Sequence, residues 1–377
     1  MDQPEIRRDT ATLRGEDVLT ALGAAVAAIC LTALIYYWIA PFSGLLGFGA
    51  LAFASFLALY AVLLWLDGDG PSVRDRLASA VIHSLAALLL VALVFVVTFT
   101  LVRGFSALVH PNFFTEDLRL AGPLEPLTVG GGLHALVGTL QQIGLALAIT
   151  IPLSLVCALF LAEMRGGFPR FVRTVVEAMT ALPSIVAGLF IYATVLLVLG
   201  FDESGFAAAL AISVMMMPIM VRAADVVLRL VPGSLKEASL ALGASRWRTA
   251  WHVILPTSRS GLATAVILGT ARGIGETSPV LLTAGYTKAL NTDPFHDPQV
   301  SLPLATFMLV KSPEPTVVAR GFGTAALLLL LVLLLFLLAR LVGGRSAGEL
   351  TARQRRARTR QSSRDVARIE RRGKGNS

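Results

Sequence analysis

Long apolar runs recur along this chain of 377 residues, and no other feature restricts its fold as much. A helix rises 1.5 Å per residue, so a run of about 20 residues crosses a hydrocarbon core of ~30 Å. Hydrophobic residues make up 55% of the chain and charged residues only 15%, with a mean hydropathy of +0.74. The sequence predicts an all-α integral membrane protein with about eight spans, at roughly residues 18–40, 45–66, 77–102, 133–162, 172–199, 206–230, 258–284 and 319–342.

Lysine and arginine are distributed unequally between the two sides of these spans. Alternate loops carry 25 basic residues on one side and 5 on the other, and the ratio is still 13 to 5 without the C-terminal tail. Because loops rich in basic residues stay in the cytoplasm, we expect both termini to be cytoplasmic. The first apolar run is too long and starts too late for a cleaved signal peptide, so residues 1–17 are expected to be a cytoplasmic segment before a retained helix.

Residues 344–377 form a polar, strongly basic cytoplasmic tail that we expect to be disordered in isolation. Each basic residue near an anionic inner leaflet contributes ~1 kcal/mol of attraction, so membrane lipids are its expected partner and a regulatory protein is the alternative. Nucleic-acid binding is not expected, because no folded basic domain or interleaved aromatic residues accompany the charge. Cys30 and Cys157 lie in apolar runs and predict no disulfide framework.

The segment EASLALGASRWRTAWHVILP, residues 237–256, lies between two spans and predicts two short amphipathic helices. Gly243 is expected to end the first helix, because glycine adopts the left-handed C′ conformation at little cost. Ser245 is expected to cap the second helix, and Pro256 to stop it. The residues expected to share a face are Leu235, Ala238, Ser239 and Leu242 in the first helix, and Trp247, Ala250, Trp251 and Ile254 in the second.

The spacing of this segment resembles a signature of importer permeases of the ABC superfamily. Their cytoplasmic loop has the form E-A-A, three residues, G, nine residues, I, one residue, L-P. The matching positions in this chain are Glu237, Ala238, Ser239, Gly243, Val253, Leu255 and Pro256. Serine replaces the second alanine and valine replaces the isoleucine. The resemblance implies that residues 234–256 form a coupling loop, which docks in a cleft of a separate ATPase subunit. The alternative is a surface helix lying among the lipid headgroups.

Two arginines, Arg222 and Arg272, lie inside predicted spans. A charge at the centre of a membrane helix costs ~2.5–3.5 kcal/mol on insertion scales, so each arginine needs a partner or a water-filled cavity. Asp225 follows Arg222 by three residues, and Glu276 follows Arg272 by four. We therefore expect each pair to share a helix face and to be partly self-neutralising.

The sequence around Arg272, GTARGIGETSP at residues 269–279, combines small residues, hydroxyls and a proline. Gly269 and Gly273 would let another helix approach closely. Thr277 and Ser278 place hydroxyls beside the charged pair, an arrangement suited to an oxyanion on a transport path. The alternative is a structural ion pair that joins the chain to a partner subunit.

The resemblance becomes more specific in this region. ARGIGETSPVLLTAG, residues 271–285, resembles the ARAxGETAPLLFTA stretch of phosphate importer permeases of the A type. LPSIVAGLFIY (182–192) and SLPLATF (301–307) also look like that family, whereas the C-type permease has Met and Ala after GET. By this resemblance Arg272 and Glu276 match charged positions of the translocation path. Arg222 is assigned to that path only because of its position within the membrane.

The resemblance covers roughly residues 77–343 and implies a type I ABC importer permease bundle with about six core spans. Residues 18–66 are expected to form an additional transmembrane hairpin with a turn at Pro41–Gly44, followed by the turn-rich linker DGDGPS at 67–72. Pro152, Pro183 and Pro218 lie within spans, so these helices are expected to be kinked. The kinks suit either a bundle that rocks or merely irregular packing.

Two long outer loops are expected at residues 103–132 and 285–319. The first is polar and rich in glycine, and it is either a flexible connector or a surface for a partner. The second is rich in Pro, Asp and Asn.

The chain has no GxxxxGK[ST] sequence to hold ATP phosphates, no HExxH motif, no cluster of His and Cys ligands and no catalytic carboxylate pair. The resemblance therefore implies a non-catalytic subunit of a phosphate importer in a bacterial inner membrane, without a cofactor of its own. Expected partners are two ATPase subunits that bind ATP and magnesium, a C-type permease and an extracytoplasmic phosphate-binding protein. The alternatives are a permease for sulfate or molybdate, an ion-driven carrier or channel, and a membrane scaffold or sensor that uses the basic tail.

Overall fold

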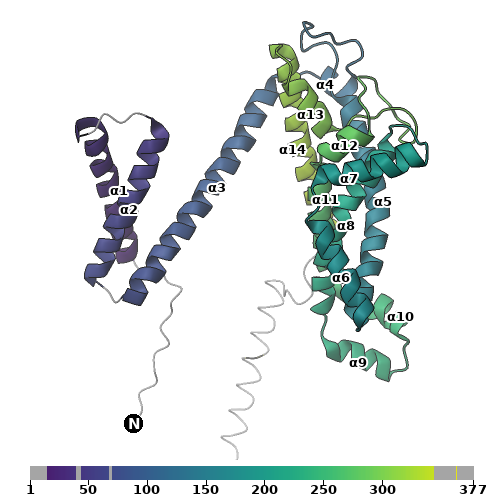
Figure 1. The fold of residues 1–377 in the computed structure, drawn as a ribbon, viewed down its shortest axis with the longest axis horizontal. Helices are drawn as coiled ribbons and strands as arrows, with labels where there is room; N and C mark the ends of the chain where they lie inside the picture. Colours follow the sequence, from purple (N-terminus) through teal and green to yellow (C-terminus); the bar gives the residue numbers. More distant parts are fainter. Residues whose placement is uncertain (1–14, 40–43, 68–69, 344–361, 363–377) are drawn as a thin grey trace, which may run out of the picture. The chain divides into compact units, whose positions relative to one another are not determined.

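A computed structural model describes residues 15–39, 44–67, 70–343 and 362. Every regular element in these ranges is a helix, so the predicted all-α fold is confirmed (Figure 1). The predicted N-terminal segment, hairpin turn and basic tail lie almost entirely outside the described residues. The elements are, in chain order, α1 (Gly15–Leu34), the π-helical turn η1 (Ile35–Ile39), α2 (Leu45–Asp67), α3 (Gly70–Leu108), α4 (Asn112–Thr115), α5 (Leu133–Glu163), α6 (Gly167–Thr180), α7 (Ser184–Ile191), η2 (Tyr192–Val198), α8 (Gly205–Arg229), α9 (Gly233–Ala241), α10 (Arg246–Thr249), η3 (Ala250–Ile254), α11 (Leu255–Ile274), α12 (Ser278–Thr283), α13 (Leu302–Val310) and α14 (Pro315–Gly343).

Seven helices in the described ranges are long and apolar enough to cross a membrane. They are α1 with η1, α2, α3, α5, α8, the continuous helix from α10 to α11, and α14. The segments α6 and α7 with η2 pass the same test only together, and a bend of 107° separates them. Counted as one broken span, this pair makes the eighth candidate, in agreement with the number predicted from the sequence.

The chain divides into two compact units, residues 1–96 and residues 97–377, and the division falls within α3. In the first unit, α1 and α2 pack as neighbours, and Ala24, Tyr60 and Leu64 form a small buried cluster that Leu77 of α3 also contacts. The predicted six-residue linker at 67–72 is wrong in its extent. Only residues 68 and 69 separate α2 from α3, because Gly70 already begins the long α3 helix.

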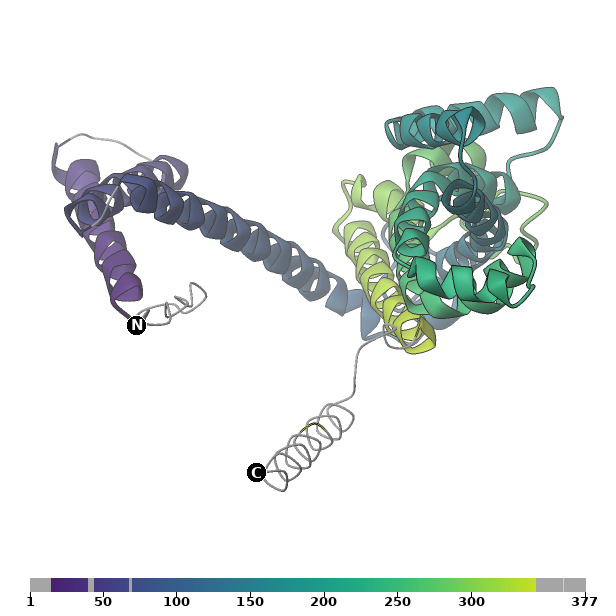
Figure 2. The ribbon, with the colours of Figure 1, turned by 90° about the horizontal axis from the view of Figure 1, so that it is seen from below.

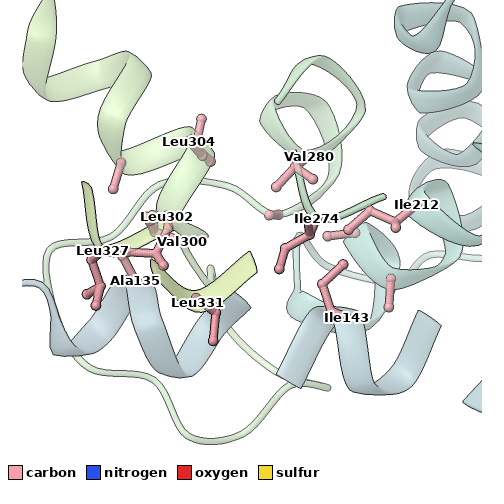
Figure 3. Close-up of a cluster of buried hydrophobic side chains, with 14 of the residues drawn as sticks. Ala135, Ile143, Ile212, Ile274, Val280, Val300, Leu302, Leu304, Leu327 and Leu331 are labelled. Carbon is pink, nitrogen blue, oxygen red and sulfur yellow. The ribbon is translucent and has the colours of Figure 1, made fainter. Parts of the chain in front are cut away.

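In the second unit, α8 packs against both α5 and α11, and α11 packs against α14 (Figures 1 and 2). α8 is central, since 61% of its most apolar stretch is buried, compared with 28% for α5 and for α14. Figure 3 shows Ile143 of α5, Ile212 of α8, Ile274 of α11 and Val280 of α12 converging in the core. The core thus joins helices that are far apart in sequence.

Small residues allow the close contact between α8 and α11. A Cβ atom at Gly269 would lie 2.4 Å from the Met220 side chain, and one at Gly273 would lie 2.4 Å from the Met216 sulfur. Since lipid tails are as apolar as the helices themselves, such close approach is a main source of association between membrane helices. The predicted role of these two glycines is confirmed.

Two spans predicted as single helices are broken. Pro183 was expected inside a helix over 172–199, but it lies outside α7 with an extended ψ of 138°. Proline disfavours a helical conformation for the residue before it, and it lacks a backbone donor, so the chain turns between α6 and α7. The predicted span 258–284 likewise ends at Ile274, and α12 starts as a separate helix at Ser278. Pro152 and Pro218, in contrast, lie within α5 and α8 as expected.

The outer loops are more structured than the sequence suggested. The predicted loop 285–319 contains the helix α13 and the beginning of α14. The loop 109–132 is held by Arg320 of α14, which is only 3% exposed. Arg320 donates hydrogen bonds to four backbone carbonyls of this loop, those of Gly122, Glu125, Pro126 and Val129. A flexible connector does not fit this arrangement, because a buried guanidinium fixes the loop.

Candidate functional site

The first helix of loop 234–256 is α9, and Gly243 ends it as the sequence predicts. Gly243 has a φ of +82°, in the left-handed region that favours glycine. Its N–H donates to the Leu240 carbonyl (2.9 Å), and the N–H of Ala244 donates to the Ser239 carbonyl (3.2 Å). These two bonds form a Schellman motif, which satisfies the free carbonyls at a helix end. The reversal of the chain at Gly243 is therefore a defined local structure.

The second helix starts at the predicted cap but does not stop at Pro256. The Ser245 hydroxyl accepts a hydrogen bond from the Arg248 N–H (3.3 Å), which confirms the cap. The helix then continues through η3 into α11, with Pro256 in the first turn of α11. At η3 the Leu255 N–H bonds to the Ala250 carbonyl, five residues back. This wider turn accommodates a proline that would otherwise clash in a regular α-helix.

The two helices of the loop are fixed to each other and to the bundle. The hydroxyls of Ser239 and Thr249 form a hydrogen bond of 2.9 Å between α9 and α10. Ala250 and Ile254 are buried and pack against a cluster that includes Leu228 at the end of α8. The loop is thus mounted on the end of the bundle, where Figure 1 shows α9 lying crosswise to the long helices.

The remaining surface of the loop is exposed and partly apolar. α9 contains no buried residue, and both Glu237 and Ala238 are exposed. Leu242 is 89% exposed, Trp247 66% and Trp251 50%, and the two indole rings contact edge to face at 5.6 Å. The predicted shared face of the second helix is therefore wrong. Its two tryptophans point outward, while the two aliphatic residues at 250 and 254 point into the bundle.

The remaining positions of the predicted loop pattern lie at the start of α11. Leu255 is half-buried and Pro256 is exposed. Ser239 is half-buried because of its bond to α10. The residues of the pattern thus divide into exposed positions that a partner can reach and positions that hold the loop in shape.

The charged pair of Arg272 and Glu276 lies at a break between two helices. Arg272 is in the last turn of α11, and Glu276 follows the helix end at Gly275. The Arg272 Nε atom is 3.0 Å from Glu276 Oε1, and the side chains are 52% and 8% exposed respectively. The predicted pairing is present, but the two residues do not share one continuous helix as expected.

Hydroxyls and free backbone groups surround this break. Thr277 and Ser278 are half-buried and lead into α12, where Pro279 occupies the first turn. Ser184, the first residue of α7, lies within reach of the Glu276 carboxylate. The Arg272 contact lacks hydrogen-bond geometry, so Glu276 Oε1 keeps a free acceptor position. Non-helical backbone at membrane depth is tolerated where it is buried or lines a cavity, and a break of this kind offers free polar groups to a solute.

The predicted pair of Arg222 and Asp225 is wrong. Asp225 binds Arg229 of the same helix at 2.9 Å and Arg173 of α6 at 3.5 Å. Arg229 is one turn away on α8, and Arg173 reaches the same carboxylate from a neighbouring helix. Arg222 is exposed, and among the described residues it has no ion-pair partner.

The end of the second unit that carries α4 is tied together at Asp117. Its carboxylate accepts hydrogen bonds from the N–H groups of Leu290 and Arg119, each at 3.0 Å. Partial burial would raise the pKa of Asp117, but these backbone bonds and the charge of Arg119 lower the pKa below its usual value.

Among the residues described, no group of three or more His, Cys, Asp or Glu side chains is arranged to hold a metal ion.

The sequence of this chain matches a known protein family. The family model described as "Binding-protein-dependent transport system inner membrane component" matches residues 150–347, which is more than half of the chain. The chain belongs to this family. The matched range of this importer permease contains both the loop 234–256 and the break at Gly275–Thr277, whereas α1, α2 and α3 precede it.

Two relatives and one solved structure are similar to this chain. "Phosphate transport system permease protein PstA 1" of Mycobacterium tuberculosis (strain CDC 1551 / Oshkosh) is 36% identical over 271 residues, covering 72% of this chain and 88% of that protein. PstA of Mycobacterium leprae (strain TN) is 36% identical over 260 residues, covering 69% and 85%. An inward-facing structure of the MetNI methionine ABC transporter aligns with a TM-score of 0.44 and 19% identity, covering 56% of this chain and 91% of that one.

Three residues that the sequence analysis did not single out contribute to these sites of the importer permease. Thr249 binds Ser239, Ser184 lies by Glu276, and Arg320 fixes the outer loop. A lone arginine at the start of an apolar run was a usable signal for Arg320, since a charge there needs partners. Thr249 and Ser184 had no such signal, because hydroxyls are common in membrane helices and their partners lie on other elements.

Proposed function

We propose that this chain is the permease subunit of an ATP-driven importer of inorganic phosphate, and that it couples to a separate ATPase through loop 234–256. The observation that carries the proposal is a single continuous helix of 29 residues, Arg246–Ile274. It begins within loop 234–256, carries Arg272 in its last turn and ends at the break that precedes Glu276. At 1.5 Å per residue such a helix is about 44 Å long, so it can carry a movement across the membrane.

The chemistry of the break supports phosphate as the solute. A guanidinium presents a planar set of donors that matches a phosphate oxyanion, and the hydroxyls of Thr277 and Ser278 add two further donors. Arg272 is half-exposed in this chain, and such a charge needs a cavity or a partner subunit beside it. We therefore assign the translocation path to Arg272, Glu276, Thr277 and Ser278. Arg222 is included because it is exposed and unpaired among the described residues.

The loop supports coupling. We propose that an ATPase subunit grips the exposed positions Glu237 and Ala238 together with Trp247, while Gly243, Leu255 and Pro256 maintain the shape of the loop and Ser239 locks its two helices. Closure of an ATPase dimer around ATP and magnesium would then move the loop, and the bundle would alternate its access. This chain would itself be non-catalytic and would hold no cofactor.

The family and the names of the relatives support a proposal for the assembly. We propose a second permease of the C type, an ATPase homodimer and an extracytoplasmic phosphate-binding protein as partners, in a bacterial inner membrane. Because loops rich in basic residues stay in the cytoplasm, we propose that loop 234–256 and both termini are cytoplasmic. The outer loops around α4 and α13 would then face the binding protein.

Uptake of labelled phosphate into vesicles that contain the co-purified subunits, with and without ATP, tests the proposal. Wild type should accumulate phosphate only with ATP, and Arg272→Gln should abolish uptake while the complex still assembles. Disassembly of the Arg272→Gln complex would instead favour a structural ion pair. An excess of sulfate or molybdate that suppresses uptake more strongly than phosphate would identify a different oxyanion, and the absence of a co-purifying ATPase would favour an ion-driven carrier.

A further inference from the structure

A basic cavity lies at the loop 234–256 end of the second unit and takes no part in the proposed transport path. It has a volume of about 380 Å³ and lies between the ends of α5 and α8 and the beginnings of α6 and α9. Five basic side chains line it: Arg165, Arg170, Arg173, Arg229 and Lys236. Its size falls in the ~300–1,000 Å³ range of small-molecule sites.

Two carboxylates neutralise only part of this charge. Asp225 pairs with Arg173 and Arg229, and Glu163 pairs with Lys236. Within the described ranges no ion pair involves Arg165 or Arg170, and both are exposed. Five cations therefore face two anions, and a bound anion would relieve the repulsion among them.

The cavity wall is held in a fixed shape. Arg173 and Arg229 both donate to the Leu161 carbonyl in the last turn of α5, at 3.3 and 3.2 Å. They also share the Asp225 carboxylate, so their guanidinium groups are positioned before any ligand arrives. Arg165, in the segment between α5 and α6, and Arg170, near the beginning of α6, also line the cavity. Arg173 and Arg229 thus satisfy a carbonyl at the end of α5. Arg165 and Arg170 take no part in these ion pairs.

We propose that this cavity binds a phosphate group, supplied either by the headgroup of an anionic phospholipid or by free phosphate on the cytoplasmic side. Arginine forks match phosphate oxygens, and basic pockets between membrane helices at this depth suit anionic headgroups. Since Lys236 belongs to α9, a ligand here would also bind the coupling loop to α5 and α6.

The test compares Arg165→Gln/Arg170→Gln with the full-length wild-type chain in nanodiscs. The matched control, Arg74→Gln/Arg259→Gln, removes the same charge from two exposed arginines on the cytoplasmic side that do not line the cavity. One arm uses native mass spectrometry to count the phosphatidylglycerol retained in discs that are otherwise phosphatidylcholine. The other measures binding of labelled inorganic phosphate in pure phosphatidylcholine discs. It uses the Arg272→Gln background, so that the proposed transport site does not contribute.

We expect the cavity variant to lose affinity by about tenfold to thirtyfold in one arm, since it removes two charges next to the ligand. The arm that responds identifies the source of the phosphate group, and the control should stay within about twofold of wild type. Arg165→Lys/Arg170→Lys keeps the charge and should retain most of the binding. Wild-type binding by the cavity variant in both arms, or an equal loss in the Lys and control variants, would overturn the proposal.

Discussion

The two ends of the second unit are built on opposite plans. At one end, loop 234–256 is held to the bundle by Ala250 and Ile254, which pack with Leu228, while its α9 helix contains no buried residue. At the other end, the loop after α4 is bound to the loop between α12 and α13, because the Leu118 N–H donates to the Lys288 carbonyl, and the buried Arg320 donates to four carbonyls of the loop after α4. The comparison teaches that the first end presents an exposed surface on a rigid base, as a site for a partner requires. At the other end, buried side chains hold the loops together.

Changing the bend of loop 234–256 should have the largest effect on function. Proline cannot adopt the φ of +82° found at Gly243, and Gly243→Pro also removes the N–H that bonds to the Leu240 carbonyl. A distortion of ~3 kcal/mol or more should reduce ATP-dependent phosphate uptake by about a hundredfold, with membrane insertion intact. Gly122→Ala at the outer end is the control, because its backbone is not left-handed and an added Cβ meets only an ordinary contact. Normal uptake by Gly243→Pro would remove the coupling proposal.

Removing the buried guanidinium should have the largest effect on stability. Arg320→Met leaves four carbonyls of the outer loop without their donor, at a cost of about 3 kcal/mol or more. We expect a lower Tm for the purified protein and faster proteolysis between residues 116 and 130. Arg119→Met is the matched control on the same loop, since Arg119 is exposed and its contact with Asp117 is 3.9 Å long. Equal effects of the two substitutions would show that the outer end does not depend on Arg320.

Loss of the bond between α9 and α10 should have a smaller effect. Ser239→Ala removes one side-chain hydrogen bond and should cost about 0.5–1.5 kcal/mol of stability, while phosphate uptake falls no more than a few-fold. The permease signature has alanine at this position, so the loop can function without the bond. Thr249→Ala should cost a similar amount, and the double variant little more than either single one. Additive costs would mean that the two hydroxyls act independently.

The smallest expected effect is a pH dependence at the outer end. The lowered pKa of Asp117 means that the folded state favours its charged form. Its contribution to stability is present above the unfolded pKa of about 3.9 and is lost as the pH falls through the lower folded pKa. Asp117→Asn should thus lower the Tm at pH 7 and approach wild type as the pH falls below about 4. Asp202→Asn, at an exposed aspartate, serves as control. A Tm difference that is independent of pH would contradict this assignment.

Two prolines illustrate where sequence reasoning failed. Pro183 was predicted inside a helix and lies at a break, whereas Pro256 was predicted to end a helix and lies within one. At Pro256 a π-helical turn makes room for the ring. At Pro183 the break is supported from outside, because Gly188 of α7 packs closely on Pro279 of α12. A proline in an apolar segment is the local signal in both cases, and the neighbouring elements decide whether the helix breaks there or continues.

The charged residues show the same division. The pairing of Arg272 with Glu276 was predictable because the two residues are four apart, and a helical turn brings residues at this spacing close together. Asp225 could choose among three arginines, and its choice depends on α6 lying beside α8. The roles of these residues in transport stay predictions, for which the uptake experiments are the test.

The sequence by itself determined the number of membrane spans, the all-helical fold and the capped bend at Gly243 and Ser245. Each of these depends on a run of neighbouring residues: the length of an apolar stretch, or the backbone preference of one glycine and one serine. Only the tertiary structure decided where the spans break, which arginines share Asp225 and how Arg320 holds the outer loop. Those features depend on partners more than 50 residues away in sequence, as for Arg173 with Asp225 (52) or Arg320 with Pro126 (194), and no local preference specifies such a contact.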